Sequence, residues 1–97
     1  PVLDGFRSDL ERSKGLAVVS RLEEATKGQV QEISRVTPSD YRLRLQPSNG
    51  GPAIVVYVLP QGTDAENAWC AAVAKGSLNQ TWADLRLTDR IVIGGGS

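Results

Sequence analysis

The sequence predicts an α+β fold in which an N-terminal helix precedes a sheet of four or five mostly antiparallel strands and a second short helix packs on the sheet. Two segments with helical spacing of apolar residues, and a run of alternating or wholly apolar segments between them, predict this class. The expected order is α-β-β-β-α-β-β, with the helices largely on one side of the sheet. A length of 97 residues suffices for one core, so 1–93 is expected to form a single domain and 94–97 a flexible Gly/Ser tail or linker.

The first predicted element is a helix from Leu3 to about Ala25, which carries two apolar stripes of different phase. The stripes consist of Leu3, Phe6 and Leu10, and of Val18, Leu22 and Ala25. Gly15 lies between them, so we expect either a kinked helix or two short helices that meet near Lys14-Gly15. Lys27-Gly28 is a helix stop signal.

Three strands are expected between the two helices. Residues 30–36 form the first, although their apolar side chains recur three apart, which a β-bulge or a continued helical turn would explain equally well. A turn at 37–40 leads to a strand whose strict alternation places Tyr41, Leu43 and Leu45 inward and Arg42 and Arg44 outward. After a loop that contains Asn49-Gly50, residues 53–59 are apolar on both faces, which is typical of a central strand covered from both sides.

The second helix is predicted to begin at a capping box, in which Thr63 and Glu66 satisfy each other's backbone amides, and to end at Gly76. Its expected buried stripe consists of Ala65, Trp69, Ala72 and Val73. Residues 82–87 alternate as a strand with Ala83, Leu85 and Leu87 on one face. A turn at 88–90 and a short strand at 91–93 complete the predicted fold.

The residue types that most enzymes need are scarce. The chain has no histidine, which removes the commonest general acid–base and a common metal ligand. Its single cysteine, Cys70, lies among alanines next to Trp69 on the predicted helix and is expected to be a small buried hydrophobe. The sequence therefore predicts a protein that is not an enzyme and that uses no cofactor or metal.

The charge balance argues against nucleic-acid binding. Eleven basic and eleven acidic residues give a formal net charge of zero. Arg42, Arg44 and Arg86 could form a basic sheet face, but the nearby Tyr41 is expected on the opposite face. No run of apolar residues is long enough to span a bilayer, so a membrane would be reached only through segments outside this chain.

The stretch from Ala53 to Gly94 resembles the globular part of type IVb pilins and of their minor-pilin and pseudopilin relatives. The shared pattern is a hydrophobic strand (AIVVYVLP), a short helix with a cysteine (AENAWCAAVAKG), and a tryptophan that opens two short strands (TWADLRL and RIVIGG). The preceding helix is similar to the amphipathic half of a pilin spine helix. The resemblance implies a non-enzymatic, extracytoplasmic subunit that is anchored in the bacterial inner membrane or assembled at the cell surface. The disulfide partner that the family's cysteine would have is missing here.

The leading interpretation is a protein–protein interaction subunit of a bacterial envelope assembly, pilin-like or a scaffold domain of type IV pilus or type II secretion machinery, that binds protein partners or itself. Its candidate partner-binding residues are Leu3, Phe6, Leu10, Arg42 and Arg44. The three apolar residues could equally belong to the core. The alternatives are an extracytoplasmic ligand-sensing domain of a membrane receptor and a small cytosolic regulatory domain. An arginine-lined pocket would favour sensing of an anion, and a flat apolar patch on the first helix would favour assembly.

Overall fold

The computed structural model describes residues 2–48, 50–76, 81–88 and 90–94. It confirms the α+β class and contains two helices and a single mixed sheet. The elements in chain order are β1 (Val2–Asp4), α1 (Asp9–Thr26), β2 (Gln29–Thr37), β3 (Asp40–Gln46), β4 (Ile54–Val58), α2 (Asp64–Ala74), β5 (Trp82–Asp84) and β6 (Val92–Gly94).

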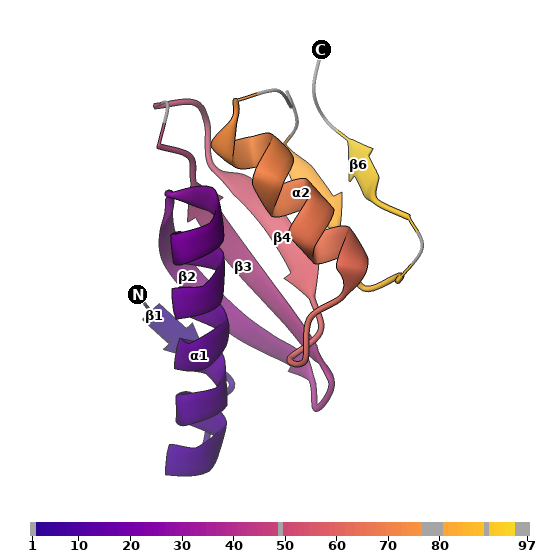
Figure 1. Ribbon diagram of the computed structural model, residues 1–97. Helices are drawn as coiled ribbons and strands as arrows, with labels where there is room; N and C mark the ends of the chain where they lie inside the picture. Colours follow the sequence, from indigo (N-terminus) through magenta and orange to yellow (C-terminus); the bar gives the residue numbers. More distant parts are fainter. Residues whose placement is uncertain (1, 49, 77–80, 89, 95–97) are drawn as a thin grey trace.

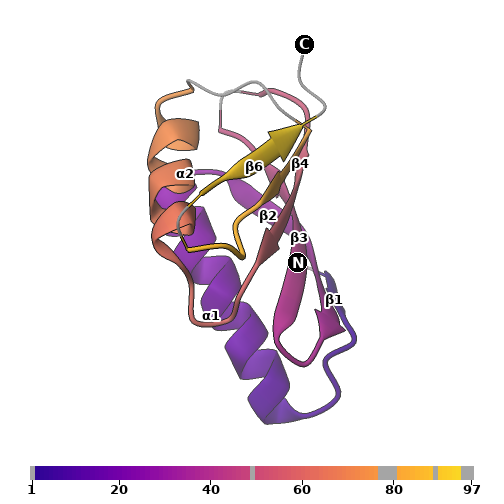
Figure 2. The ribbon, with the colours of Figure 1, turned by 90° about the vertical axis from the view of Figure 1, so that its right-hand side faces the viewer.

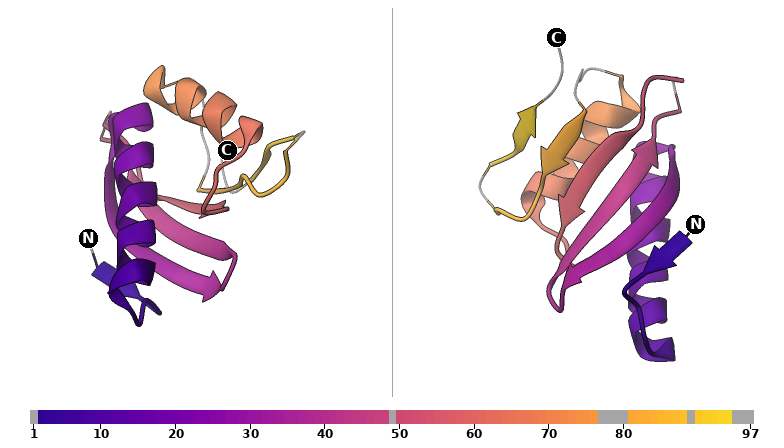
Figure 3. Two further views of the ribbon diagram at one scale, coloured as in Figure 1. Left: turned by 60° about the horizontal axis from the view of Figure 1, so that its bottom comes forward. Right: turned by 180° about the vertical axis from the view of Figure 1, so that it is seen from behind.

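The sheet has six strands, in the same spatial order as in the sequence. Three neighbouring pairs are antiparallel, whereas β1 with β2 and β4 with β5 are parallel. Parallel neighbours need a crossover connection, and α1 and α2 provide the two crossovers. Both helices lie on the same face of the sheet, and no helix among the described residues lies over the other face (Figures 1 and 2). The right-hand view of Figure 3 looks onto this uncovered face.

The hydrophobic core lies between the two helices and the inner face of the sheet. Its fully buried members are Val18, Leu22, Val30, Ile33, Leu43, Leu45, Val56, Val58, Trp69, Ala83 and Leu85. Inward residues alternate with outward ones along β3 and β4, as predicted for β3. The second helix also buries its predicted stripe, except that Ala72 is half-exposed and Cys70 is buried in its place.

The N-terminal helix begins later than the sequence predicts. Leu3 lies in β1, a parallel edge strand in which it pairs with Ile33, and α1 starts only at Asp9. Ser8 caps the helix in a capping box: its Oγ accepts a hydrogen bond from the Glu11 amide at 3.1 Å, and the Glu11 carboxylate accepts one from the Ser8 amide at 3.0 Å. The sheet therefore has six strands where the sequence predicts four or five, because β1 is a three-residue edge strand and is too short to show a periodic pattern.

Gly15 does not break α1, which runs without interruption through this position. Instead, Gly15 makes room for Phe6 from the β1–α1 loop, since a Cβ there would lie 2.8 Å from the Phe6 ring. Phe6 is buried in turn against Tyr41, edge to face at a centroid distance of 5.3 Å. At the other end, Lys27 adopts the left-handed conformation that terminates the helix, one residue before the predicted glycine.

The irregular spacing in β2 is due to β-bulges. The register with β3 shifts by one between Val30 and Glu32, and again between Arg35 and Thr37. The first bulge lets both Val30 and Ile33 face inward, although they are three residues apart. The second bulge leaves Val36 exposed.

Of the two C-terminal strands, β5 is shorter than predicted and β6 is displaced by one residue from the predicted 91–93. The predicted strand 82–87 is regular only over β5, although Leu85 beyond it is still buried; Leu87 is exposed. β6 ends at Gly94, so the expected tail overlaps it by one residue. Asn49, Asp89 and residues 95–97 lie outside the described residues. Within the part of the chain that the structure covers, neither helix has the length and apolar character needed to cross a membrane.

Candidate functional site

The uncovered face of the sheet is the candidate functional surface, and we call it the open face. Two rows of side chains cross it, because the strand register aligns every second residue. One row is Val2, Glu32, Arg44, Val55, Trp82 and Gly94, and the other is Asp4, Ser34, Arg42, Tyr57, Asp84 and Val92. The open face thus combines aromatic, aliphatic and charged residues from all six strands.

Aromatic and aliphatic side chains gather where β4 meets β5. Val55 and Tyr57 are half-buried on the outward side of the central strand, and Trp82 of β5 is 37% exposed beside Val55. With Ala53 and Thr81 they line an open hollow of about 660 Å³. The sequence predicts cover on both sides of this strand, but helices cover only the inner side. The residues on its outer side, Val55 and Tyr57, are therefore only half-buried.

Gly94 positions the Trp82 side chain. A Cβ on Gly94 would lie 2.6 Å from the indole ring, so the ring rests directly on the backbone of β6. One face of the indole is thereby covered within the protein. The position of the ring as a wall of the hollow depends on glycine at this point.

Arginine side chains border the apolar hollow on the β3 side. Arg42 and Arg44 are both exposed, as predicted, and are the cross-strand neighbours of Tyr57 and Val55. They border a smaller depression of about 120 Å³, and Val55 lines both this depression and the apolar hollow. Arg44 contacts Glu32 at 3.3 Å, whereas no ion pair joins Arg42 to any residue that the structure describes.

A third arginine, Arg86, is fully engaged. It forms ion pairs with Asp84 at 2.7 Å and Asp40 at 3.3 Å, and its guanidinium lies 5.2 Å from the centroid of the Tyr57 ring. The hydrogen bond from Arg86 holds the pKa of Asp84 below its ordinary value, and the same bond raises the pKa of Arg86. Arg86 therefore stiffens the Tyr57 end of the open face and is not free for a ligand.

The predicted apolar stripe of Leu3, Phe6 and Leu10 is not one surface. Leu3 packs against the core from β1, Phe6 is buried beneath α1, and only Leu10 is exposed, at 66%. The prediction was wrong because helical spacing was extended through residues that form a strand and a loop. Of the five candidate partner-binding residues, the structure brings only Arg42 and Arg44 together.

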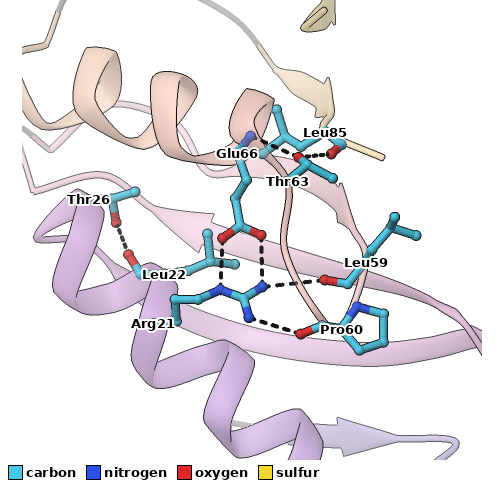
Figure 4. Close-up of polar contacts among 8 residues, drawn as sticks. All are labelled: Arg21, Leu22, Thr26, Leu59, Pro60, Thr63, Glu66 and Leu85. Atoms are coloured by element: carbon cyan, nitrogen blue, oxygen red, sulfur yellow. Dashed lines mark hydrogen bonds and ion pairs between the residues drawn. The ribbon is translucent and has the colours of Figure 1, made fainter. Parts of the chain in front are cut away.

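A buried carboxylate and a part-buried arginine between the helices have a structural role. Figure 4 shows the Glu66 carboxylate turned toward α1, where Arg21 donates to both of its oxygens at 2.8 Å and also to the carbonyls of Leu59 and Pro60. Glu66 is 2% exposed, so this fork ties α1 to α2. The predicted capping box is therefore only half formed: Thr63 accepts from the Glu66 amide at 3.0 Å, but the Glu66 side chain does not return the bond.

Cys70 is buried, as predicted, and it lies near this pair. Burial, with Glu66 as a secondary cause, raises the pKa of the Cys70 thiol to about 12. A thiol with that pKa is protonated at neutral pH and is a poor nucleophile. Among the described residues, no group of three potential ligands could hold a metal ion.

Comparison with known proteins leaves the open face as the main guide to function. No protein-family model matches the chain, and neither a curated protein nor a solved structure is detectably similar to it. The most informative residues of the open face, Tyr57 and Trp82, were not among the sequence candidates. The available signal was the unbroken apolar run of β4, which indicated that both of its faces need cover.

Proposed function

We propose that this protein is a non-enzymatic protein–protein interaction module and that the open face binds the partner. The observation that carries the proposal is the juxtaposition of Tyr57, Trp82 and the arginines of β3 on a face that neither helix of the described chain covers. Tyrosine, tryptophan and arginine are the residues most enriched at the energetic centres of protein interfaces. We therefore propose the partner-binding surface on the sheet and not on the first helix.

The charges on the open face favour a protein partner over a nucleic acid. Tyr57 and Trp82 share a face with the arginines, as in RNA-binding sheets. However, Glu32 neutralises Arg44, and Asp84 and Asp40 neutralise Arg86. Such a balanced surface would not attract a polyanion, which needs several unpaired cations along its path.

The proposed setting is a bacterial envelope assembly, on the strength of the resemblance to type IVb pilins. That resemblance rests on the segment from Ala53 to Gly94. The first helix no longer contributes to it, because α1 starts at its Ser8 cap after β1 and so does not continue upstream as a spine would. We therefore place the assembly contact on the sheet and leave α1 to the fold.

A ligand-sensing domain is the second candidate, because Arg42 and Arg44 do border a depression. Its volume of about 120 Å³ is below the roughly 300–1,000 Å³ of typical small-molecule sites, and the adjoining hollow of about 660 Å³ is open and lined by no arginine. Glu32 also lines it and already pairs with Arg44 at 3.3 Å, so a small free anion would be held by Arg42 alone. Titration with sulfate, phosphate and citrate tests this alternative, and saturable binding lost in Arg42→Gln would favour sensing.

Position-specific photocrosslinking in the source cells tests the proposed function. Trp82 is replaced by p-benzoylphenylalanine, which keeps an aromatic ring, and Leu16 on α1, of similar exposure at 44%, provides the matched control. We expect a discrete protein adduct from position 82 and none from position 16. Adducts from position 16 alone, or nucleic acid in place of protein at position 82, would overturn the proposal.

A further inference from the structure

We propose that the open face recognises an extended partner segment in which an acidic residue is followed two positions later by an apolar one. This inference rests on the proposed function and names the chemistry of the partner. It is carried by two neighbouring hollows of different character, one bordered by Arg42 and Arg44 and the other lined by Val55, Tyr57 and Trp82. Val55 lies in both, so the two hollows form one continuous surface.

The acidic residue of the partner is inferred from Arg42. This arginine is exposed on β3 and has no ion-pair partner among the described residues, whereas the other two arginines of this face are bound to carboxylates. Arg44 beside it contacts Glu32 through a single long contact of 3.3 Å, so it can turn to a second carboxylate. A partner carboxylate would therefore gain a guanidinium that does not first have to break a bond within the protein.

The apolar residue of the partner is inferred from the second hollow. Its walls are Val55, Tyr57 and Trp82, and Arg86 and Gly94 already hold the two rings in place. Rigid aromatic walls lose little conformational entropy when a side chain enters between them. A branched aliphatic side chain is the simplest group that fits an open hollow of this kind.

The spacing follows from sheet geometry. Strands lie about 4.8 Å apart, and the apolar hollow lies between β4 and β5, so its centre is about one and a half strand steps, or about 7 Å, from β3. In an extended chain, residues two positions apart point to the same side and are separated by about 6.6 Å. Arg44 lies in the row of Val55 and Trp82, and Arg42 lies in the next row, beside Tyr57. A segment that crosses the strands obliquely can therefore place its carboxylate between Arg42 and Arg44 and its apolar side chain in the hollow between Tyr57 and Trp82.

The test uses blocked peptides and the ¹⁵N-labelled protein. The probe is acetyl-Gly-Ser-Glu-Ser-Leu-Ser-Gly-amide, and the control peptides carry Lys for Glu or Ser for Leu. With the probe at up to about 5 mM, we expect saturable amide shifts centred on Arg42, Val55, Tyr57 and Trp82. Each control peptide should bind roughly tenfold more weakly, because it loses either the charge-assisted hydrogen bond or the apolar contact.

Charge reversal provides the protein-side control. Arg42→Glu should weaken the Glu probe roughly tenfold and make the Lys peptide the better ligand. Arg12→Glu makes the same change in net charge on α1, where Arg12 pairs only with exposed Asp9, and should leave binding unchanged. A loss of affinity that is equal in the two variants would mean that net charge, and not Arg42, governs binding.

Other outcomes separate this inference from the proposed function. Equal binding of the Glu and Lys peptides at the same residues would overturn the acidic requirement while still placing a peptide on the open face. No binding of any peptide would overturn the inference, and the crosslinking from position 82 would then decide the proposed function independently. Shifts on the open face caused by a dT₁₀ oligonucleotide, with none from the peptides, would overturn both.

Discussion

The Phe6 ring occupies the space that a side chain at Gly15 would need. A Cβ on Gly15 would lie 2.8 Å from Phe6 Cε1 and 2.9 Å from Cζ. This contact closes the N-terminal loop over α1 and buries Phe6 against Tyr41. The glycine in the middle of this helix is thus a packing site, in the position where the sequence suggests a break.

Gly15→Ala should destabilise the protein by about 1 kcal/mol, even though alanine is the better helix former by about the same amount. The reason is that Phe6 is held by Tyr41 and cannot move away freely. Urea unfolding measures the difference. In a Phe6→Ala background the ring is gone, so the same substitution should become stabilising; a stabilising effect in the wild type would show that the ring gives way easily.

Leu10→Asp should change the free energy of unfolding by no more than about 0.5 kcal/mol, because Leu10 is 66% exposed on the N-terminal turns of α1. Phe6→Ala, from the same predicted stripe, should cost about 3 kcal/mol because Phe6 is buried. Thermal or urea unfolding of the two variants separates the residues. Under the proposed function, Leu10→Asp should also leave the crosslink from position 82 intact, and its loss would return the interface to α1.

Arg21→Met should destabilise the protein by roughly 3 kcal/mol, because Glu66 would remain buried without its counter-charge. Replacing both partners, with Arg21→Met and Glu66→Leu, should recover a large part of the loss, since no unpaired charge is then buried. Arg12→Met, which removes an exposed ion pair with Asp9, is the matched control and should change stability by less than about 0.5 kcal/mol. A cost for Arg21→Met as small as for the control would contradict a structural role for the pair.

Thr63→Ala should cost about 1–2 kcal/mol, because the Thr63 hydroxyl both caps α2 and donates to the carbonyl of Leu85 at 2.7 Å. Thr63→Ser keeps both hydrogen bonds and should stay within about 0.5 kcal/mol of the wild type. Chemical denaturation of the three proteins is the measurement. Peptide binding to the open face should not change in either variant, and a parallel loss of binding would connect the α2 cap to the site.

Cys70 should make the protein less stable at high pH. The pKa of its thiol is about 12 in the folded state against 9.0 in its ordinary state, so the unfolded chain loses this proton first. The contribution of the Cys70 thiol to the free energy of unfolding is constant below pH 9 and then decreases as the pH rises toward 12. Cys70→Ala lacks this group, and the difference in unfolding free energy between variant and wild type should shift in favour of the variant between pH 8 and pH 10.5. A constant difference, or rapid thiol labelling of the native protein at pH 8, would contradict burial of the thiol.

The fold class, β3, β4, α2 and the C-terminal end of α1 could be predicted because their signals are local. Alternation along residues 41–45, the apolar run of β4 and the Thr63 cap each act within a few positions of the residues concerned. The start of α1 was missed although Ser8-Asp9-Leu10-Glu11 has the capping-box pattern. The helical spacing of apolar residues from Leu3 onward predicted an earlier start than this capping box does.

Tertiary structure decided the features that depend on distant partners. β1 exists because β2 offers it an edge, Gly15 accommodates a ring that arrives from a loop, and Glu66 turns from its own cap to an arginine 45 residues away. The open face is also a tertiary property, since outward residues of six strands form one surface only after both crossover helices lie on the other side. Periodicity can indicate that a strand has two apolar faces, but only the packing of helices determines which of them remains uncovered.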